Sequence, residues 1–233
     1  MDRIHREDGR DLLTRAIGPG VVVWGVIVGI GFLITGPLSA IDRREDSVAA
    51  AFNRSRTDLW DGITDVWSRV GNTEIIIATC VVVTAVLLWR TRDWRFSAVP
   101  AIAISLQATI FVLATHTVGR VRPPVLPEDP SPPTSSFPSG HVGAATALYA
   151  SFALLAAERI ERTWLRRLVI ALCVTLPLLV TYARLYRGAH HLSDVVVGIA
   201  NGLVCAGLAY GWYRHRARSS GSSTRAKVHS AVG

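Results

Sequence analysis

Cysteine is scarce in this chain, with only three among 233 residues. Cys80, Cys173 and Cys205 lie far apart, each inside an apolar run. Such spacing gives no disulfide framework. We expect all three to be small apolar packing residues.

Charge is missing from six long stretches. They cover residues 16–41, 75–89, 96–119, 130–157, 168–183 and 195–213. A membrane-spanning helix needs roughly 17–25 mostly apolar residues, which most stretches supply and two supply with their flanks. A soluble protein of this size would rarely contain six such runs. The sequence therefore predicts one all-α domain over residues 16–213, an integral membrane bundle of six transmembrane helices.

The first apolar run lacks a small-x-small cleavage site and is too long for a signal peptide, so we expect it to be retained. Internal repeats are absent. Residues 1–15 form the predicted cytoplasmic N-terminal segment. Residues 214–233 lack apolar periodicity and predict a disordered basic tail.

The net charge of +8 does not indicate a nucleic-acid partner, because the basic residues follow the membrane topology. With six spans and an inside N-terminus, 16 of the 25 Lys and Arg fall in inside segments and nine in outside segments. This matches the positive-inside rule. It predicts a multi-pass protein of the plasma membrane with both termini in the cytoplasm, in contact with anionic lipid heads.

Two outer-side loops have distinct compositions. Apolar residues at helical spacing between charges make 42–73 an amphipathic, interfacial helix, either a connector packed on the bundle or a roof over a lipid substrate. Residues 123–138 hold seven of the eleven prolines, which excludes a helix interior and predicts a stiff loop, either a plain connector or a lid.

Three polar clusters lie at the outer ends of the spans. They are "GRVRP" (Gly119–Pro123), "PSGH" (Pro138–His141) and "RLYRGAHHLSDVVVG" (Arg184–Gly198). The predicted topology brings all three to one membrane face. Polar groups beside hydrocarbon are costly and usually functional, so this convergence predicts a site.

The third cluster contains His190 and Asp194, four residues apart and hence on one helix face. An aspartate there accepts the Nδ1 proton of His190, which fixes the tautomer and leaves Nε2 free to attack. The alternative is an N-capping aspartate beside an interfacial histidine.

The second cluster opens a helix. Ser139 is a good N-cap, and Gly140 lets a ligand approach the backbone closely. Free N–H groups at a helix N-terminus bind anions, and His141 beside them suits a general acid. The alternative is an ordinary helix cap.

Arginines complete the set, with Arg120 and Arg122 in the first cluster and Arg184 in the third. Their planar forks suit phosphate oxygens. A metal site built from the histidines and Asp194 is the competing interpretation, but surrounding arginines repel a cation. We therefore expect a phosphate site with no metal and no other cofactor.

Together the motifs resemble those of the type-2 phosphatidic acid phosphatase family of membrane-embedded lipid phosphate phosphatases. That family carries Lys, six residues, then Arg-Pro; Pro-Ser-Gly-His; and Ser-Arg, five residues, His, three residues, Asp. The matching residues here are Arg122-Pro123, Pro138 to His141, Arg184, His190 and Asp194.

The resemblance implies a role for each matching residue. His190 would be the nucleophile that forms a phosphohistidine, Asp194 its orienting partner, and His141 the acid that protonates the leaving oxygen. The implied phosphate cradle consists of Arg122, Arg184, Ser139 and the backbone of Gly140.

Two positions depart from the family pattern. Thr115 stands where the family has Lys, and Ala183 precedes Arg184 in place of Ser. Thr115 still offers one hydrogen bond to phosphate, and Arg120 is the candidate to replace the missing charge. His191 has no place in the pattern and is expected to be an interfacial polar residue.

The sequence thus predicts an enzyme that hydrolyses a lipid phosphate or prenyl diphosphate on the outer face. The alternatives are a lipid phosphotransferase that uses the same site and a non-enzymatic lipid or anion transporter that kept the cradle. Soluble vanadium-dependent haloperoxidases share these motifs, but six spans argue against that class. The sequence does not identify the lipid or the oligomeric state.

Overall fold

The structure, a computed structural model, describes residues 6–125 and 135–232, with the side chains of the last helix described as far as Ser219. Helices make up the described part, which contains no strand. In chain order they are α1 (Arg6–Leu12), the π-helical turn η1 (Leu13–Ile17), α2 (Gly18–Thr35), α3 (Ala40–Arg54), α4 (Asp58–Val70), α5 (Thr73–Thr91), α6 (Trp94–Val118), α7 (Gly140–Arg159), α8 (Thr163–Tyr186) and α9 (Leu192–Val232).

Six helices of the described chain are long and apolar enough to cross a membrane, which confirms the predicted all-α bundle. They comprise Arg6–Thr35, Thr73–Thr91, Trp94–Val118, Gly140–Arg159, Thr163–Tyr186 and Leu192–Ser219.

The turn between α5 and α6 shows how the sequence ends a span. Arg92 takes the left-handed conformation (φ 56°), and the carboxylate of Asp93 caps α6 by accepting from Phe96 N at 3.1 Å.

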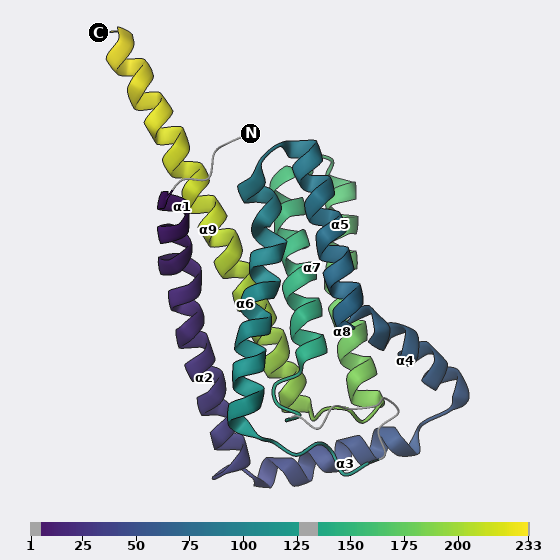
Figure 1. Cartoon of the computed structure of the whole chain (residues 1–233). Helices are drawn as coiled ribbons and strands as arrows, with labels where there is room; N and C mark the ends of the chain where they lie inside the picture. The colour runs from purple at the N-terminus through teal and green to yellow at the C-terminus, as the bar shows by residue number, and fades with distance from the viewer. Residues whose placement is uncertain (1–5, 126–134, 233) are drawn as a thin grey trace.

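Helices α7 and α9 form the centre of the bundle, with α6 and α8 packed beside α7 (Figure 1). In the most apolar segment of α7, and likewise of α9, half of the residues are buried. In that of α5 only about a tenth are buried. Glycine makes their close approach possible: a Cβ at Gly202 would lie 2.6 Å from Gly143 O, and one at Gly198 2.8 Å from Ser139 O. Such small residues allow helix backbones to touch inside a membrane.

The long loop at 42–73 contains two helices where the sequence predicted one. The break falls at residues 55–57, where Thr57 takes an extended conformation and its hydroxyl caps α4 by accepting from Trp60 N. In Figure 1, α3 lies across the end of the bundle and α4 leads from it toward α5. The rings of Trp60 and Trp67 on α4 pack on Tyr182 of α8.

The domain is longer at both ends than predicted. Residues 6–15 are helical, and the buried carboxylate of Asp8 bonds Arg95 Nε at 2.9 Å and Arg216 Nε at 2.8 Å. α9 runs past residue 213 to Val232, and Arg214 bonds Glu158 at 2.5 Å. Charge pairs hold Asp8, Arg214 and Arg216 to the bundle, and such pairs leave no apolar periodicity in the sequence. Residues 1–5 and 126–134 lie outside the described residues, and 126–134 make up most of the loop that the sequence predicted to be either a connector or a lid.

Candidate active site

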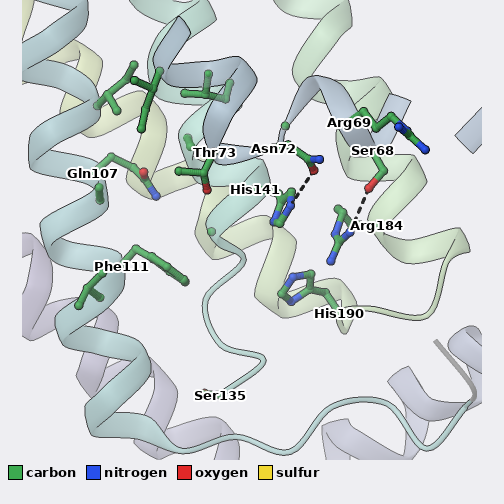
Figure 2. Close-up of a pocket in the computed structure, with 18 of the residues that line it drawn as sticks. Ser68, Arg69, Asn72, Thr73, Gln107, Phe111, Ser135, His141, Arg184 and His190 are labelled. Carbon is green, nitrogen blue, oxygen red and sulfur yellow. Dashed lines mark hydrogen bonds between the residues drawn. The ribbon is translucent and has the colours of Figure 1, made fainter. Parts of the chain in front are cut away.

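A pocket of about 630 Å³ opens at one end of the bundle, where the three polar clusters of the sequence meet (Figure 2). Its predicted lining residues are Arg122, Gly140, His141, Arg184 and His190. The other predicted residues, which are Thr115, Arg120, Ser139 and Asp194, are not part of its lining but lie buried around it. Five of the nine predicted site residues therefore line the pocket, and the other four are buried outside its lining.

His190 lies in the short turn between α8 and α9. The turn is possible because Gly188 adopts a positive φ of 70°, which lets Ala189 N bond Arg184 O at 3.1 Å. In Figure 2 the side chains of His190, His141 and Arg184 are gathered on one wall of the pocket.

The Nδ1 atom of His190 lies 2.8 Å from the carbonyl oxygen of Ser136 and 3.7 Å from Asp194 Oδ2. The first distance is a hydrogen bond and the second is too long for one. Donation from Nδ1–H to Ser136 O leaves Nε2 as the nitrogen with the lone pair. The predicted Asp194–His190 pair is therefore close in space, but the backbone of Ser136 takes the orienting hydrogen bond.

Burial lowers the pKa of His190 below its ordinary 6.5, with the nearby guanidinium groups of Arg184 and Arg122 acting in the same direction and Asp194 opposing them. A lowered pKa keeps the imidazole neutral near pH 7. A neutral imidazole with Nε2 unprotonated has the electronic state of a nucleophile.

Asp194 is fully buried and joins all three clusters. Its Oδ1 accepts from Arg120 Nη1 at 2.5 Å, and its Oδ2 accepts from His191 N at 2.8 Å, at the start of α9. Its backbone carbonyl accepts from Ser139 N at 3.0 Å, just before α7. Asp194 thus fixes the first turn of α7 against the turn that carries His190.

Arg120 does not face the pocket, contrary to its predicted place in the phosphate cradle. Besides Asp194, its guanidinium bonds Asp42 at 2.6 Å, Glu45 at 2.8 Å and Ser193 Oγ at 2.7 Å. Three carboxylates and a hydroxyl occupy its two Nη atoms, and Arg120 is not among the residues that line the pocket. The sequence analysis did not predict that Asp42 and Glu45 of α3 bind Arg120, because they lie at least 75 residues away along the chain.

His191 belongs to the same buried network and is not an interfacial residue. Its Nε2 lies 3.2 Å from Asp46 Oδ1 on α3, and its Nδ1 lies 3.5 Å from Asp194 Oδ2. Burial opposes the charged form, but the contacts with the carboxylates outweigh it and raise the pKa of His191. A protonated His191 would help to balance the carboxylates of α3.

Arg122 and Arg184 are the two arginines of the predicted cradle that line the pocket. Arg122 Nη1 donates to Ala189 O at 2.7 Å, next to His190. Arg184 Nη1 donates to Ser68 Oγ on α4 at 3.0 Å, which is drawn in Figure 2. Ser68, which no motif indicated, thus positions a guanidinium beside the nucleophile candidate.

The start of α7 presents His141 to the pocket. Its Nε2 lies 3.2 Å from Asn72 Oδ1, the residue before α5, another partner that the motifs did not indicate. Gly140 is required by packing, because a Cβ there would lie 2.8 Å from the ring of Phe111. Ser139 is the predicted N-cap residue, but its buried hydroxyl makes no cap hydrogen bond and has no partner among the described residues.

Thr115 does not reach the pocket. It is buried near the end of α6, and its Oγ1 donates to the carbonyl oxygen of Ser135 at 3.2 Å. Ala183 is completely buried in α8. Neither Thr115 nor Ala183, the two positions that depart from the family motifs, therefore contributes a side chain to the lining. The hydrogen bond from Thr115 instead holds the segment that leads to Ser136.

Within the described residues, no three His, Cys, Asp or Glu side chains gather in an arrangement that could hold a metal ion. The pocket instead combines two guanidinium groups, two imidazoles and a helix N-terminus. Those groups complement an anion such as phosphate.

Two solved structures share this fold. The first transmembrane PAP2 type phosphatidylglycerolphosphate phosphatase from Bacillus subtilis is 19% identical, with a TM-score of 0.75 over 84% of this chain and 96% of that one. LpxE from Aquifex aeolicus is 22% identical, with a TM-score of 0.53 over 71% of this chain and 93% of that one. No curated protein sequence matches the chain.

The sequence pattern of the PAP2 superfamily matches residues 98–218, slightly more than half of the chain. The match runs from α6 to α9 and includes the segments that supply Arg122, His141, Arg184 and His190. With the shared membrane phosphatase fold, this match is decisive: the chain belongs to the PAP2 superfamily.

Proposed function

We propose that this protein hydrolyses a phosphoester or diphosphate of a membrane lipid through a covalent phosphohistidine on His190. The observation that carries the proposal is the composition of the pocket. Arg122, His141, Arg184 and His190 line one part of it, while Ile76, Ile77, Ile104, Phe111 and Val112 of α5 and α6 line another. A phosphate joined to a hydrocarbon chain matches both parts.

In the first step, Nε2 of His190 attacks phosphorus while Arg122 and Arg184 stabilise the charge on the equatorial oxygens. The bond from phosphorus to the lipid oxygen breaks, and His141 gives that oxygen a proton. Nδ1–H of His190 stays bonded to Ser136 O. The ring becomes positive as the P–N bond forms, and the carboxylate of Asp194, 3.7 Å away, favours this charge.

In the second step, a water molecule attacks phosphorus and His141 takes its proton. The P–N bond breaks, which releases inorganic phosphate and restores neutral His190. The first product is a lipid alcohol, or a lipid monophosphate where the substrate is a diphosphate. No metal takes part, because the two arginines supply the positive charge.

The distribution of Lys and Arg supports a site on the extracytoplasmic side of the plasma membrane. The termini of α5, α7 and α9 that carry the site would then face outward. Lipid would reach the pocket laterally, since the α5 and α6 residues that line it belong to membrane-crossing helices.

The test is phosphate release by purified protein in detergent, over phosphatidic acid, phosphatidylglycerol phosphate and polyprenyl phosphates and diphosphates. His190→Gln should reduce release to background, while His116→Gln, at an exposed position on α6, should retain it. Activity should persist in EDTA and be inhibited by vanadate, which mimics five-coordinate phosphorus. Activity lost in EDTA and restored by one divalent ion, or retained in His190→Gln, would overturn the mechanism.

A further inference from the structure

Gln107 is a polar residue of the pocket lining that has no role in the proposed phosphate chemistry. Gln107 lies in the middle of α6 and is only 2% exposed. The other α6 residues that line the pocket are Ile104, Ala108, Phe111 and Val112. Figure 2 shows the Gln107 amide on the opposite side of the pocket from Arg184 and His190.

The side-chain amide of Gln107 has no hydrogen-bond partner among the described residues, although the backbone carbonyl of Gln107 accepts from Asn201 Nδ2 at 3.4 Å. The amide atoms open onto the pocket, whose wall at this level is otherwise apolar, and a polar group in such surroundings is stabilised by a hydrogen-bond partner. Native structures satisfy such groups with protein, water or a ligand. The amide lines the pocket, so a ligand there can reach it.

Neighbouring residues fix the depth of this amide. Its Nε2 occupies space next to Gly143 of α7, where a Cβ would lie only 2.4 Å away. Phe111, which packs against Gly140 at the start of α7, is one turn closer to the phosphate end of α6 than Gln107. One turn of helix is about 5–6 Å, so the amide lies roughly that much deeper than the phosphate-binding end.

We propose that Gln107 is a specificity-determining residue that donates a hydrogen bond from Nε2 to an ester carbonyl of the lipid substrate. In an acylated glycerol phosphate the ester carbonyls lie a few bonds beyond the phosphate, at the depth of this amide. A polyisoprenoid phosphate offers only hydrocarbon there and leaves the amide unpartnered. The inference rests on the proposed function and assigns acyl-ester lipid phosphates as its preferred substrates.

The test uses three substrates that share a phosphomonoester: a diacyl glycerol phosphate, the dialkyl ether analogue with the same chain lengths, and farnesyl monophosphate. Wild-type kcat/KM should be roughly five- to tenfold higher for the ester than for the ether, which is the effect of one hydrogen bond. Gln107→Leu keeps the size and removes the amide. It should lower the ester rate to that of the ether and leave the other two rates unchanged.

Thr109→Val is the matched control, since Thr109 is an exposed α6 residue whose hydroxyl bonds only Ser105 O of its own helix. It should preserve the ester-to-ether ratio. Equal wild-type rates on ester and ether would overturn the inference, even if Gln107→Leu fails to fold. So would a Gln107→Leu protein that keeps the ratio or loses all three activities in proportion. Absence of phosphate release from every lipid by the wild type would instead refute the proposed function.

Discussion

At the residue scale, the two arginines of "GRVRP" have different tasks although they are two positions apart. Arg120 is buried among Asp42, Glu45 and Asp194, whereas Arg122 lines the pocket. The sequence analysis predicted both as phosphate ligands, with Arg120 as the candidate to replace the charge missing at Thr115. The acidic residues that claim Arg120 come from α3, and no local pattern connects them to it.

Arg120→Gln should destabilise the protein, because it leaves buried carboxylates without their cation, at a cost of about 3–5 kcal/mol. Arg122→Gln should leave the unfolding temperature nearly unchanged and lower kcat/KM by about 10–100-fold, through loss of a charge-assisted contact to phosphate. Thermal unfolding in detergent and phosphate release measure the two effects. A stable Arg120→Gln protein with a raised KM would place Arg120 at the substrate.

The protonation of His190 gives a second prediction. Its pKa lies below 6.5 because of burial, so the imidazole stays neutral and nucleophilic as pH falls to 6.5 and loses reactivity only below that. Carbethoxylation by diethyl pyrocarbonate, which requires a neutral imidazole, can be followed at His190 by peptide mass spectrometry. We expect the midpoint of its pH dependence below 6.5. A midpoint above 6.5 would mean that Asp194 outweighs burial and that His190 is charged near neutral pH.

The residues of the candidate site were only partly predictable from the sequence. The motifs indicated Arg122, His141, Arg184 and His190, all of which line the pocket. The motifs did not indicate the hydrogen-bond partners of these four residues. Those partners are Ser68, Asn72, Ser136 and Ala189. Two of these contribute only backbone carbonyls, and the other two are on α4 and before α5. Side-chain identity gives no information about a backbone carbonyl, and Ser68 and Asn72 lie outside all three sequence clusters.

At the scale of elements, long apolar runs predicted the spans because hydrocarbon tolerates little else for a helix of that length. The bent connector was harder to predict, since its break at Thr57 depends on one cap and not on hydropathy. Its first helix, α3, turned out to be part of the support of the site. Glu45 bonds both the backbone N and the hydroxyl of Ser193 at 2.8 Å.

Glu45→Ala should therefore loosen the first turn of α9 and the adjoining His190 turn. We expect kcat to fall about tenfold with KM little changed, because misalignment of a nucleophile affects the chemical step. Arg43→Ala, at an exposed position on α3, is the control and should retain full kcat. A rise in KM alone would instead make α3 part of the substrate site, and equal behaviour of the two variants would exclude a positioning role.

At the scale of the whole molecule, charge patterning sets the expected orientation in the membrane. A cysteine in place of exposed Ser55, between α3 and α4 near the site, should react with an impermeant thiol reagent on intact cells. One in place of exposed Thr163, at the opposite end of the bundle, should react only after the membrane is permeabilised. The native cysteines are buried and should give a low background. The reverse labelling pattern would place the site in the cytoplasm.

The central claim is that His190 becomes covalently phosphorylated during turnover. The most direct measurement is rapid quenching in alkali, where phosphohistidine is stable, followed by mass spectrometry of the peptides. The account predicts phosphate on His190 in wild-type protein mixed with a lipid phosphate substrate, and none on His141 or His191. Phosphate on either of those residues would contradict the account. A His141→Ala protein that turns over a substrate with an activated leaving group, yet never shows a phosphorylated form, would also contradict it.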